Sequence, residues 1–413
     1  MLPHPSPIPD QESLTVEFKS DQTKMSDPDL VNLVVCMANT EGGDIYLGVE
    51  DDGRLTGLHA DHHNLAGLPA MIAHRTQPPL SVTVEELHVA GNVIAKIKVP
   101  KSRIPVATSE GLLRRRQLLH DGTPECVPFY PHEIQRRQSD LGILDYSARP
   151  VREASVQDFD PLERERLRQM IGRYGGDAAL LSLNDEELDG ALGLVTREEG
   201  AKAPTVAGLL MVGREAALRM YLPTHETAFQ VMEGTRVRVN DFYRTPLLKT
   251  FERIIEQFEA RVEEDEVQIS LFRVPVPNYD RGAFREALVN ALIHRDYTRL
   301  GAVHVRMESD GIVISNPGGF VEGVTLENLL VVEPRPRNPL LADIVKRIGL
   351  AERTGRGVDL IYKGLLRYGR PAPNYNRSDA HSVVLQMSNA KADIPFLQLI
   401  IGKGEFEGGA KTL

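Results

Sequence analysis

Residues 284–297, with the sequence FREALVNALIHRDY, hold the most informative pattern in the chain. Within this stretch Glu286, Asn290 and His294 follow one another at intervals of four residues, and the positions between them are mostly apolar. Side chains four residues apart lie on the same face of an α-helix. The spacing therefore predicts an otherwise apolar helix over 284–294 with one polar stripe, in which an acid precedes an amide by one turn.

Two glycine-rich turns follow this helix in the sequence. Asn316-Pro317-Gly318-Gly319 comes directly after a predicted strand hairpin, and Thr354-Gly355-Arg356-Gly357 opens a predicted helix at 358–366. Glycine allows the backbone to approach a flat base closely, and free N–H groups at a helix start bind phosphate. Each feature alone is common in proteins, so the prediction of a nucleotide site rests on their order along the chain.

This order resembles the GHKL ATP-binding fold of gyrases, chaperones, histidine kinases and mismatch-repair proteins. The divergent form found in bacterial Schlafen-type transcriptional regulators is the most similar, through 284–297, 314–320 and Arg337-Asn338-Pro339. The resemblance implies that Glu286 orients the attacking water of an ATPase and that Asn290 holds the Mg²⁺ of bound ATP. Further residues that it assigns to the nucleotide are Asn316 at the adenine, Gly318 and Gly319 making room for it, and Gly355 and Gly357 at the phosphates.

The chain departs from the GHKL pattern in three places. An asparagine, Asn316, stands where the family usually has an aspartate, and an amide offers a donor and an acceptor but no charge. In addition, the phosphate loop is short and no lid lysine is recognisable. The sequence therefore leaves open whether ATP is bound only or also hydrolysed.

A second resemblance covers the start of the chain. Residues 12–19, 38–43 and 48–53 are similar to the Schlafen-type divergent Alba domain, a nucleic-acid-binding module. Period-2 alternation predicts strands at 14–19, 82–89, 93–99 and 112–117. On the last two strands the predicted contacts to DNA or RNA are Lys96, Lys98, Arg114 and Arg116, because basic side chains on one face bind phosphates. Such charges are also common on surfaces that only face solvent.

Some Schlafen proteins are endoribonucleases that use three carboxylates, which gives an alternative function for the same domain. Glu12, Glu17 and Asp51 match that arrangement in spacing and could bind a divalent metal ion, and Lys19 could neutralise charge in the transition state. Glu12 and Glu17 have opposite strand parity, so this site requires the chain to bend near Ser13. Alternatively, Glu17 and Lys19 form a same-face ion pair that stabilises the fold little.

Length and composition bound the remaining possibilities. With 413 residues, 41% of them hydrophobic, the chain is long enough for two or three cores. Its net charge of −10 gives no overall attraction to nucleic acid, although residues 91–140 carry nine Lys or Arg against five Asp or Glu. No apolar stretch is long enough for a membrane span and no secretory signal is visible, so we expect a cytoplasmic protein. The two cysteines, Cys36 and Cys126, are predicted to be buried thiols.

The predicted fold class is α+β multidomain. The predicted parts are a Schlafen/Alba-like domain at 11–140, a linker at 141–155, a connecting α/β region at 156–275, a GHKL-like α/β sandwich at 276–390, and a tail at 391–413 that resembles a truncated winged helix. In the connecting region a strand is predicted at 205–212. The expected function is a nucleotide-responsive nucleic-acid-binding protein, a transcriptional regulator that acts as a dimer, with ATP and Mg²⁺ as ligands.

Overall fold

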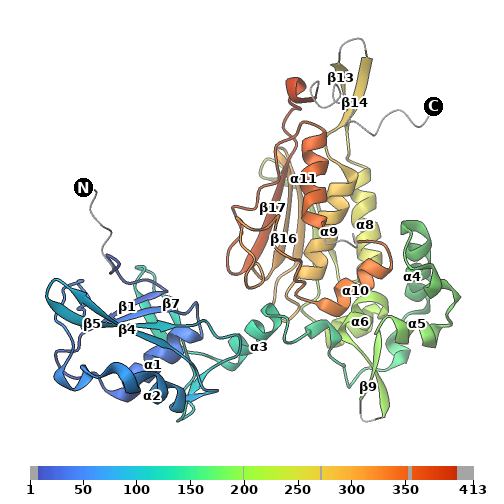
Figure 1. Cartoon of the computed structure of the whole chain (residues 1–413). Coiled ribbons are helices and arrows are strands. Elements are labelled where there is room, and N and C mark those ends of the chain that lie inside the picture. The colour runs from blue at the N-terminus through green and yellow to red at the C-terminus, as the bar shows by residue number, and fades with distance from the viewer. Residues whose placement is uncertain (1–7, 199, 270–271, 352–355, 398–413) are drawn as a thin grey trace. The chain divides into compact units, whose positions relative to one another are not determined.

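The computed structural model describes residues 8–198, 200–269, 272–351 and 356–397 (Figure 1). It divides into two compact units, Met1–Gln138 and Ser139–Leu413. Both units combine helices with sheets, so the predicted α+β multidomain class is confirmed. No helix within the described residues has both the length and the apolar character that crossing a bilayer requires.

The N-terminal unit is built on a four-stranded sheet with the order β1-β2-β5-β4. These strands are β1 (Val16–Lys19), β2 (Gly43–Leu47), β4 (Thr83–Val89) and β5 (Asn92–Val99). Strands β1 and β2 run parallel, and α1 (Asp27–Ala38) makes the crossover between them. Eight of the twelve residues of α1 are buried, and the helix packs with α2 (Leu68–His74) in the main core of this unit.

Shorter elements complete this part of the chain. They are β3 (Thr76–Gln77), β6 (Ala107–Thr108), β7 (Arg114–Leu118), β8 (Pro124–Pro128) and α3 (Pro131–Asp140). Strands β7 and β8 form a two-stranded sheet of their own. A disulfide bond joins Cys36 of α1 to Cys126 of β8, with the two Cα atoms 5.9 Å apart. The prediction of two buried thiols is therefore wrong, because α1 and β8 lie side by side although 90 residues separate the cysteines.

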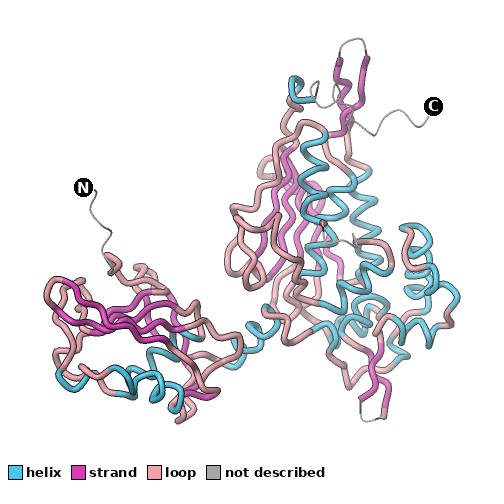
Figure 2. The backbone as a smooth tube through the Cα atoms, in the orientation of Figure 1, coloured by secondary structure: helices cyan, strands magenta, loops and turns pink. Residues whose placement is uncertain are grey.

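The C-terminal unit is built on a five-stranded sheet with the order β12-β11-β15-β16-β17. Its strands are β11 (Thr227–Glu233), β12 (Arg236–Tyr243), β15 (Val303–Glu308), β16 (Gly311–Pro317) and β17 (Ser382–Ser388). Only the β11–β15 pair is parallel. Three helices, α8 (Leu247–Glu259), α9 (Arg281–His294) and α11 (Gly357–Arg367), lie along one face of the sheet (Figure 2).

The other elements of this unit surround these two layers. They are α4 (Pro161–Tyr174), α5 (Asp185–Ala191), β9 (Val195–Glu198), β10 (Ala201–Pro204), α6 (Val206–Val212), α7 (Glu215–Tyr221), β13 (Glu264–Ile269), β14 (Phe272–Pro277) and α10 (Pro339–Arg347). The strand predicted at 205–212 is wrong: the segment is helix α6, with Thr205 accepting a hydrogen bond from the backbone N–H of Gly208 at 3.0 Å. Every residue of α6 is buried, so its sequence shows no polar face from which a helical period could be recognised.

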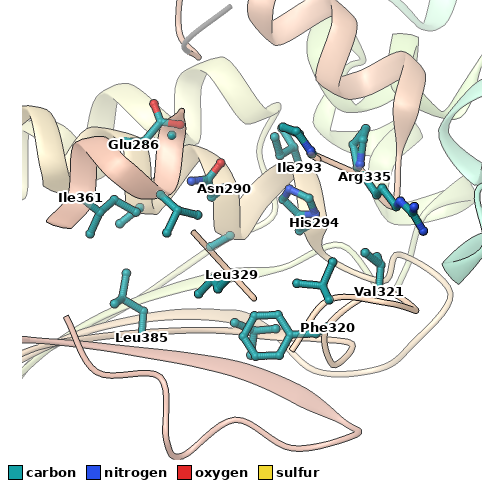
Figure 3. A pocket seen from close by; sticks show the side chains of 18 of the residues that line it. Glu286, Asn290, Ile293, His294, Phe320, Val321, Leu329, Arg335, Ile361 and Leu385 are labelled. Carbon is teal, nitrogen blue, oxygen red and sulfur yellow. The ribbon is translucent and has the colours of Figure 1, made fainter. Parts of the chain in front are cut away.

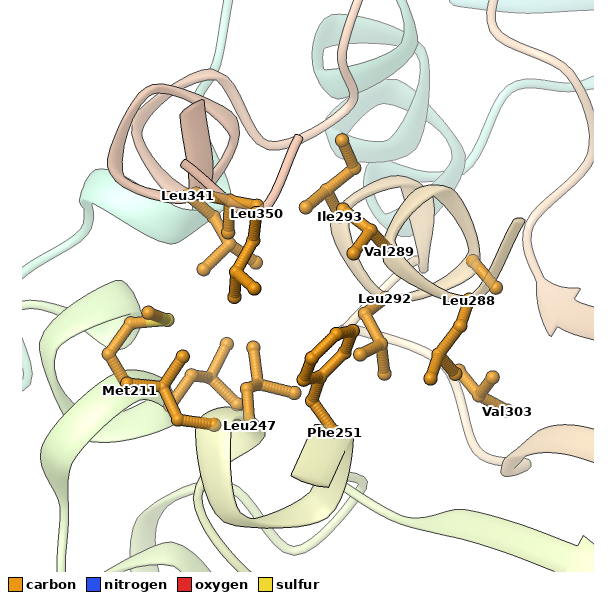
Figure 4. Packing of buried hydrophobic residues seen from close by; sticks show 14 of the residues in the cluster. Met211, Leu247, Phe251, Leu288, Val289, Leu292, Ile293, Val303, Leu341 and Leu350 are labelled. Carbon is orange, nitrogen blue, oxygen red and sulfur yellow. The ribbon is translucent and has the colours of Figure 1, made fainter. Parts of the chain in front are cut away.

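The main hydrophobic core of the C-terminal unit draws on residues from Ala154 to Met387, and a small second cluster forms around Val276 and Leu397. Figure 4 shows Met211, Leu247 and Phe251 packing against Leu292 of α9 and Leu350. The predicted boundary between residues 275 and 276 lies inside this core, and strands from both sides of it share the five-stranded sheet.

Candidate functional site

A pocket of about 360 Å³ opens between the helix layer and the sheet of the C-terminal unit (Figure 3). Its walls come from α9, α10 and the start of α11, from β16 and β17, and from the connecting segment 319–336. The volume falls in the range of cavities that hold small molecules.

The polar stripe of α9 forms one wall of this pocket. Glu286, Asn290 and His294 all line it, and Figure 3 shows Glu286 and Asn290 one turn apart on the side of the helix that borders the cavity. The Glu286 side chain is 3% exposed. The sequence thus places the acid and the amide on one face, and the packing of α9 turns that face toward the cavity.

The start of α11 packs directly against this stripe. A Cβ atom at Gly357, the first residue of α11, would overlap Glu286 Oε1 and lie 3.4 Å from Asn290 Nδ2. A side chain at this position would therefore displace the carboxylate. No side chain caps the N-terminus of α11 within the described residues. The first backbone N–H groups of a helix are the kind of donors that bind an anion.

His294 is a neutral group in the wall. Burial, together with the positive charges of Arg337 and Lys346, lowers its pKa to about 4. Desolvation disfavours the charged imidazolium, and nearby cations act in the same direction. The imidazole therefore adds no charge to the pocket at neutral pH.

Arg337 and Asn338 fix the position of α9 within the site. Asn338, fully buried, donates through Nδ2 to the carbonyl oxygens of Ile293 at 2.8 Å and Arg295 at 2.9 Å. Arg337 donates to the carbonyl of His294 at 3.2 Å and to that of Gly319 at 2.7 Å. The Arg-Asn-Pro motif thus ties the C-terminal end of α9 to the glycine turn after β16.

The residues of that turn differ in their relation to the pocket. Asn316 lines the pocket and is 5% exposed, whereas Gly318 does not line it. Gly318 has φ +97°, and a Cβ there would lie 2.9 Å from Asp296 Cβ, so this glycine makes room for another part of the same chain. Gly319 lines the pocket, but a Cβ there would meet the backbone of Asp379 and Ala380. The role of both glycines in making room for a base stays a prediction, and Gly355 lies outside the described residues.

The wall opposite the polar stripe is apolar. Phe320, Leu329 and Leu385 point into the cavity in Figure 3, and Tyr375 also lines it. Tyr375 is buried, and this burial raises its pKa, so the phenol stays protonated. A flat, weakly polar group is the kind of ligand that such a wall accepts.

Three cationic residues line the pocket that the sequence did not single out. Lys346 comes from α10, Arg335 from the segment before it, and Arg356 directly precedes α11. Arg335 and Arg356 are exposed and Lys346 is half-buried. Sequence inspection identified no lid lysine because Lys346 looks like an ordinary basic residue in the last turn of a helix. Only the fold brings these three cations to one cavity.

The predicted basic face of the N-terminal unit is split between two sheets. Lys96 and Lys98 share one face of β5, where Lys96 Nζ lies 3.1 Å from Asp44 Oδ2 and Lys98 is exposed. This contact raises the pKa of Lys96. Arg114 and Arg116 lie instead in the β7–β8 hairpin, and Arg116 is 3% exposed because it forms an ion pair with Glu17. Arg116 is therefore not part of one exposed face with Lys96 and Lys98.

The three carboxylates of the nuclease alternative do not form a metal site within the described residues. The chain does bend at Ser13, and Glu12 accepts a hydrogen bond from the Phe18 backbone at 2.8 Å. Burial raises the pKa of Glu12, with smaller contributions from Glu17 and Asp51. Glu17, however, is bound by Lys19 at 2.7 Å and by Arg116, and the described part of the chain contains no group of three or more His, Cys, Asp or Glu placed to hold a metal ion.

The chain thus consists of two units, and the C-terminal unit encloses a cavity between a mixed sheet and a layer of helices. Residues 12–118 match the family described as "Schlafen, AlbA_2", and residues 301–386 match "Putative ATP-dependent DNA helicase recG C-terminal". The predicted Schlafen/Alba and ATPase-like architecture is thus confirmed. Residues 135–228 match a domain of unknown function. Glu286 and Asn290 lie outside the matched segment 301–386, but in the folded protein they line the same pocket as residues of that segment.

A solved structure is similar over almost the whole chain. The crystal structure of the DIP2311 protein from Corynebacterium diphtheriae is 24% identical in sequence, with a TM-score of 0.53. The similarity covers 94% of this chain and 78% of that one, and it shows a shared fold. No curated protein matches the chain.

Proposed function

We propose that the protein binds ATP in the C-terminal pocket and nucleic acid through its N-terminal unit, and that it acts as a nucleotide-responsive regulator of transcription. The observation that carries the ATP site is the pocket itself. An acid and an amide one turn apart on α9 border a cavity whose opposite wall is apolar. Its remaining charged lining holds three cations, Arg335, Lys346 and Arg356, and two acids, Glu333 and Asp359. The match of residues 301–386 to an ATP-dependent protein's C-terminal segment supports the same ligand.

Each wall of the pocket suits one part of ATP. The apolar wall around Phe320 suits the base, and the Asn316 amide in the same pocket offers it both a donor and an acceptor. The uncapped start of α11 and the nearby side chains of Lys346 and Arg356 suit the phosphates. Glu286 is then close to the phosphate end of the nucleotide, because Gly357 packs against its carboxylate.

The donor set near the phosphates also fits Mg²⁺. Glu286 and Asn290 supply a carboxylate and an amide oxygen at the same wall, and Mg²⁺ prefers oxygen ligands combined with phosphate oxygens. Asn290 would hold the ion, which neutralises phosphate charge when bound. Glu286 would then be the residue that orients water toward the terminal phosphate.

A titration with ATP tests this site and separates the roles of the two residues. We expect Asn290→Ala to weaken binding of ATP in the presence of Mg²⁺ by about tenfold or more, and Glu286→Gln to abolish phosphate release while ATP still binds. Asn240→Ala, an exposed asparagine on β12 outside the pocket, is the matched control. Equal affinity for ATP in wild type and Asn290→Ala would overturn the metal-holding role.

The proposal for nucleic acid rests on the Schlafen, AlbA_2 match and on the cations that remain accessible. Lys98 is exposed on β5, and Arg114 is half-buried at the edge of the β7–β8 hairpin. We expect Lys98→Glu and Arg114→Glu to weaken binding of a labelled oligonucleotide and to reduce the dependence of affinity on salt. Lys24→Glu is the matched control, since Lys24 is exposed on the same unit but outside both strands. Cleavage of the oligonucleotide, lost in Glu17→Gln, would instead favour the nuclease alternative.

A further inference from the structure

A groove of about 510 Å³ lies in the N-terminal unit, separate from the predicted face on β5. Its charged lining consists of the cations Lys19, Arg114 and Arg116 and the acids Glu17, Asp29 and Glu125. Asn32 also lines it, and Cys126 forms part of its wall. Two buried polar atoms of this lining, Asn32 Oδ1 and Arg116 Nε, have no hydrogen-bond partner within the described residues. Buried polar atoms are normally paired, so these two are prepared for a ligand that offers both a donor and an acceptor.

The β7–β8 hairpin carries two of the cations of this groove, Arg114 and Arg116, but has little apolar packing of its own. Arg116 is the only buried side chain in the two strands. Strand β7 is held from the end of α1, where Asn39 Nδ2 donates to the Arg114 carbonyl at 2.8 Å and Thr40 Oγ1 accepts from the Arg116 N–H at 2.7 Å. An isolated two-stranded hairpin is at best marginally stable, so attachment to the rest of the unit decides whether it is ordered.

The outer strand β8 depends on the disulfide bond for this attachment. Its only sheet partner is β7, and Cys126 ties it covalently to Cys36 on the buried side of α1. Cys36 is fully buried, whereas Cys126 is half-buried and borders the groove. A thiolate that enters from solvent therefore reaches the sulfur of Cys126 and not that of Cys36.

We propose that the Cys36–Cys126 bond is a reducible latch on the β7–β8 hairpin, and that the groove binds a phosphate-bearing strand more tightly when the bond is closed. Disulfide bonds in the cytoplasm, the compartment expected from the sequence, are usually transient and redox-sensing. The ligand class rests on the proposed nucleic-acid function, whereas the latch rests on the bond and the hairpin alone.

The chemistry of opening needs only a low-molecular-weight thiol. A first thiolate attacks Cys126 Sγ, forms a mixed disulfide there and releases Cys36 as a thiolate, which takes up a proton. A second thiolate attacks the sulfur of the first, which yields a small-molecule disulfide and the Cys126 thiolate. Two thiols are oxidised and one protein disulfide is reduced to two thiols, and the reverse exchange closes the latch.

Hydrogen exchange on the full-length protein tests the latch without any ligand. After reduction with dithiothreitol, we expect amide exchange in residues 114–128 to become about tenfold faster or more, with exchange in α1 and in residues 206–212 unchanged. Cys126→Ser should exchange fast in this segment with or without dithiothreitol. Unchanged exchange in 114–128 after verified reduction overturns the latch, and so does faster exchange across all of α1, which would make the bond a staple of the whole unit.

Two further measurements complete the test. The first uses a series of buffers that runs from oxidised to reduced glutathione, with the fraction of open Cys36–Cys126 bond quantified by thiol alkylation. We expect the bond to open within this series, and a bond that stays closed in every buffer contradicts the proposal.

The second measures binding of a labelled single-stranded oligonucleotide. It should bind about three- to tenfold more weakly to the reduced wild type, with no effect of reduction on Cys126→Ser. Equal affinity in both states of a protein that binds the oligonucleotide overturns the coupling. Failure to bind in either state overturns the proposed nucleic-acid function, and hydrogen exchange then decides by itself whether the latch exists.

Discussion

Gly357 has a role at the pocket that differs from the one usually given to glycine in a phosphate loop. Its first neighbour is the Glu286 carboxylate, which a Cβ atom would overlap. The carboxylate is the far end of a flexible side chain, so it can move aside at little cost in folding free energy. A methyl group at this position should therefore displace Glu286 and leave the fold intact.

Gly357→Ala is accordingly expected to abolish ATP hydrolysis while the free energy of unfolding changes by less than about 1 kcal/mol. Steady-state phosphate release and urea unfolding measure the two quantities. Gly172→Ala is the matched control: it lies in α4, no atom is within 4 Å of the added Cβ, and alanine should be neutral or stabilise by about 0.5–1 kcal/mol. Normal phosphate release by Gly357→Ala would show that the position of Glu286 does not matter.

Two histidines make the C-terminal unit sensitive to acid. His225 is 2% exposed and donates through Nε2 to the Thr245 carbonyl at 2.8 Å. Burial lowers its pKa to about 4, as it does that of His294. A histidine with a lowered pKa in the folded state stays neutral while the unfolded chain takes up a proton below its ordinary pKa of ~6.5. Stability is therefore lost as the pH falls from ~6.5 toward about 4.

For each of these histidines, we expect the free energy of unfolding to fall by about 2 kcal/mol when the pH is lowered from about 7 to about 5. His225→Gln keeps a donor for the Thr245 carbonyl but does not titrate, so its unfolding free energy should fall by about 2 kcal/mol less than that of the wild type over the same range. Urea unfolding at the two pH values measures the difference. Identical losses in wild type and His225→Gln would contradict a buried neutral imidazole.

At the scale of elements, Asn338 supplies two of the side-chain hydrogen bonds that hold the end of α9, and Arg337 supplies another. In Asn338→Ala the buried carbonyls of Ile293 and Arg295 lose their donor, and an unpaired buried polar group costs about 1–3 kcal/mol. We expect a loss of about 2–4 kcal/mol in unfolding free energy and weaker ATP binding, because the stripe on α9 is no longer fixed. Asn376→Ala, an exposed asparagine of the same unit, should change either quantity little. Wild-type stability of Asn338→Ala would contradict this anchoring role.

The elements also show what the sequence could and could not predict. Helix α9 was predictable because its polar residues recur every four positions on an otherwise apolar segment. Helix α6 was not, because burial on all sides removes that period. The Cys36–Cys126 bond, the burial of Arg116 and the cations Arg335 and Lys346 in the pocket all depend on contacts between distant segments, which leave no local signal.

At the scale of the whole molecule, the main core of the C-terminal unit extends on both sides of residue 275, and the proposed ATP pocket depends on residues far outside the matched segment 301–386. Strand β11 lies between β12 and β15 in the sheet, so it joins the part before residue 275 to the part after it. Phe258 of α8 stacks on Phe284 of α9 with the ring centroids 3.8 Å apart. The helix that carries Glu286 and Asn290 is therefore supported from the first half of this unit.

A fragment of residues 276–413 should consequently fail to fold, whereas residues 139–413 should fold. The shorter fragment loses β11 and β12 and exposes both the edge of β15 and the apolar side of α9 that packs on α8. Thermal unfolding followed by circular dichroism should show a cooperative transition for 139–413 and none for 276–413, and only the longer fragment should bind ATP. A cooperative transition in 276–413 would show that the sheet divides where the sequence placed the domain boundary, and that the pocket needs only the last third of the chain.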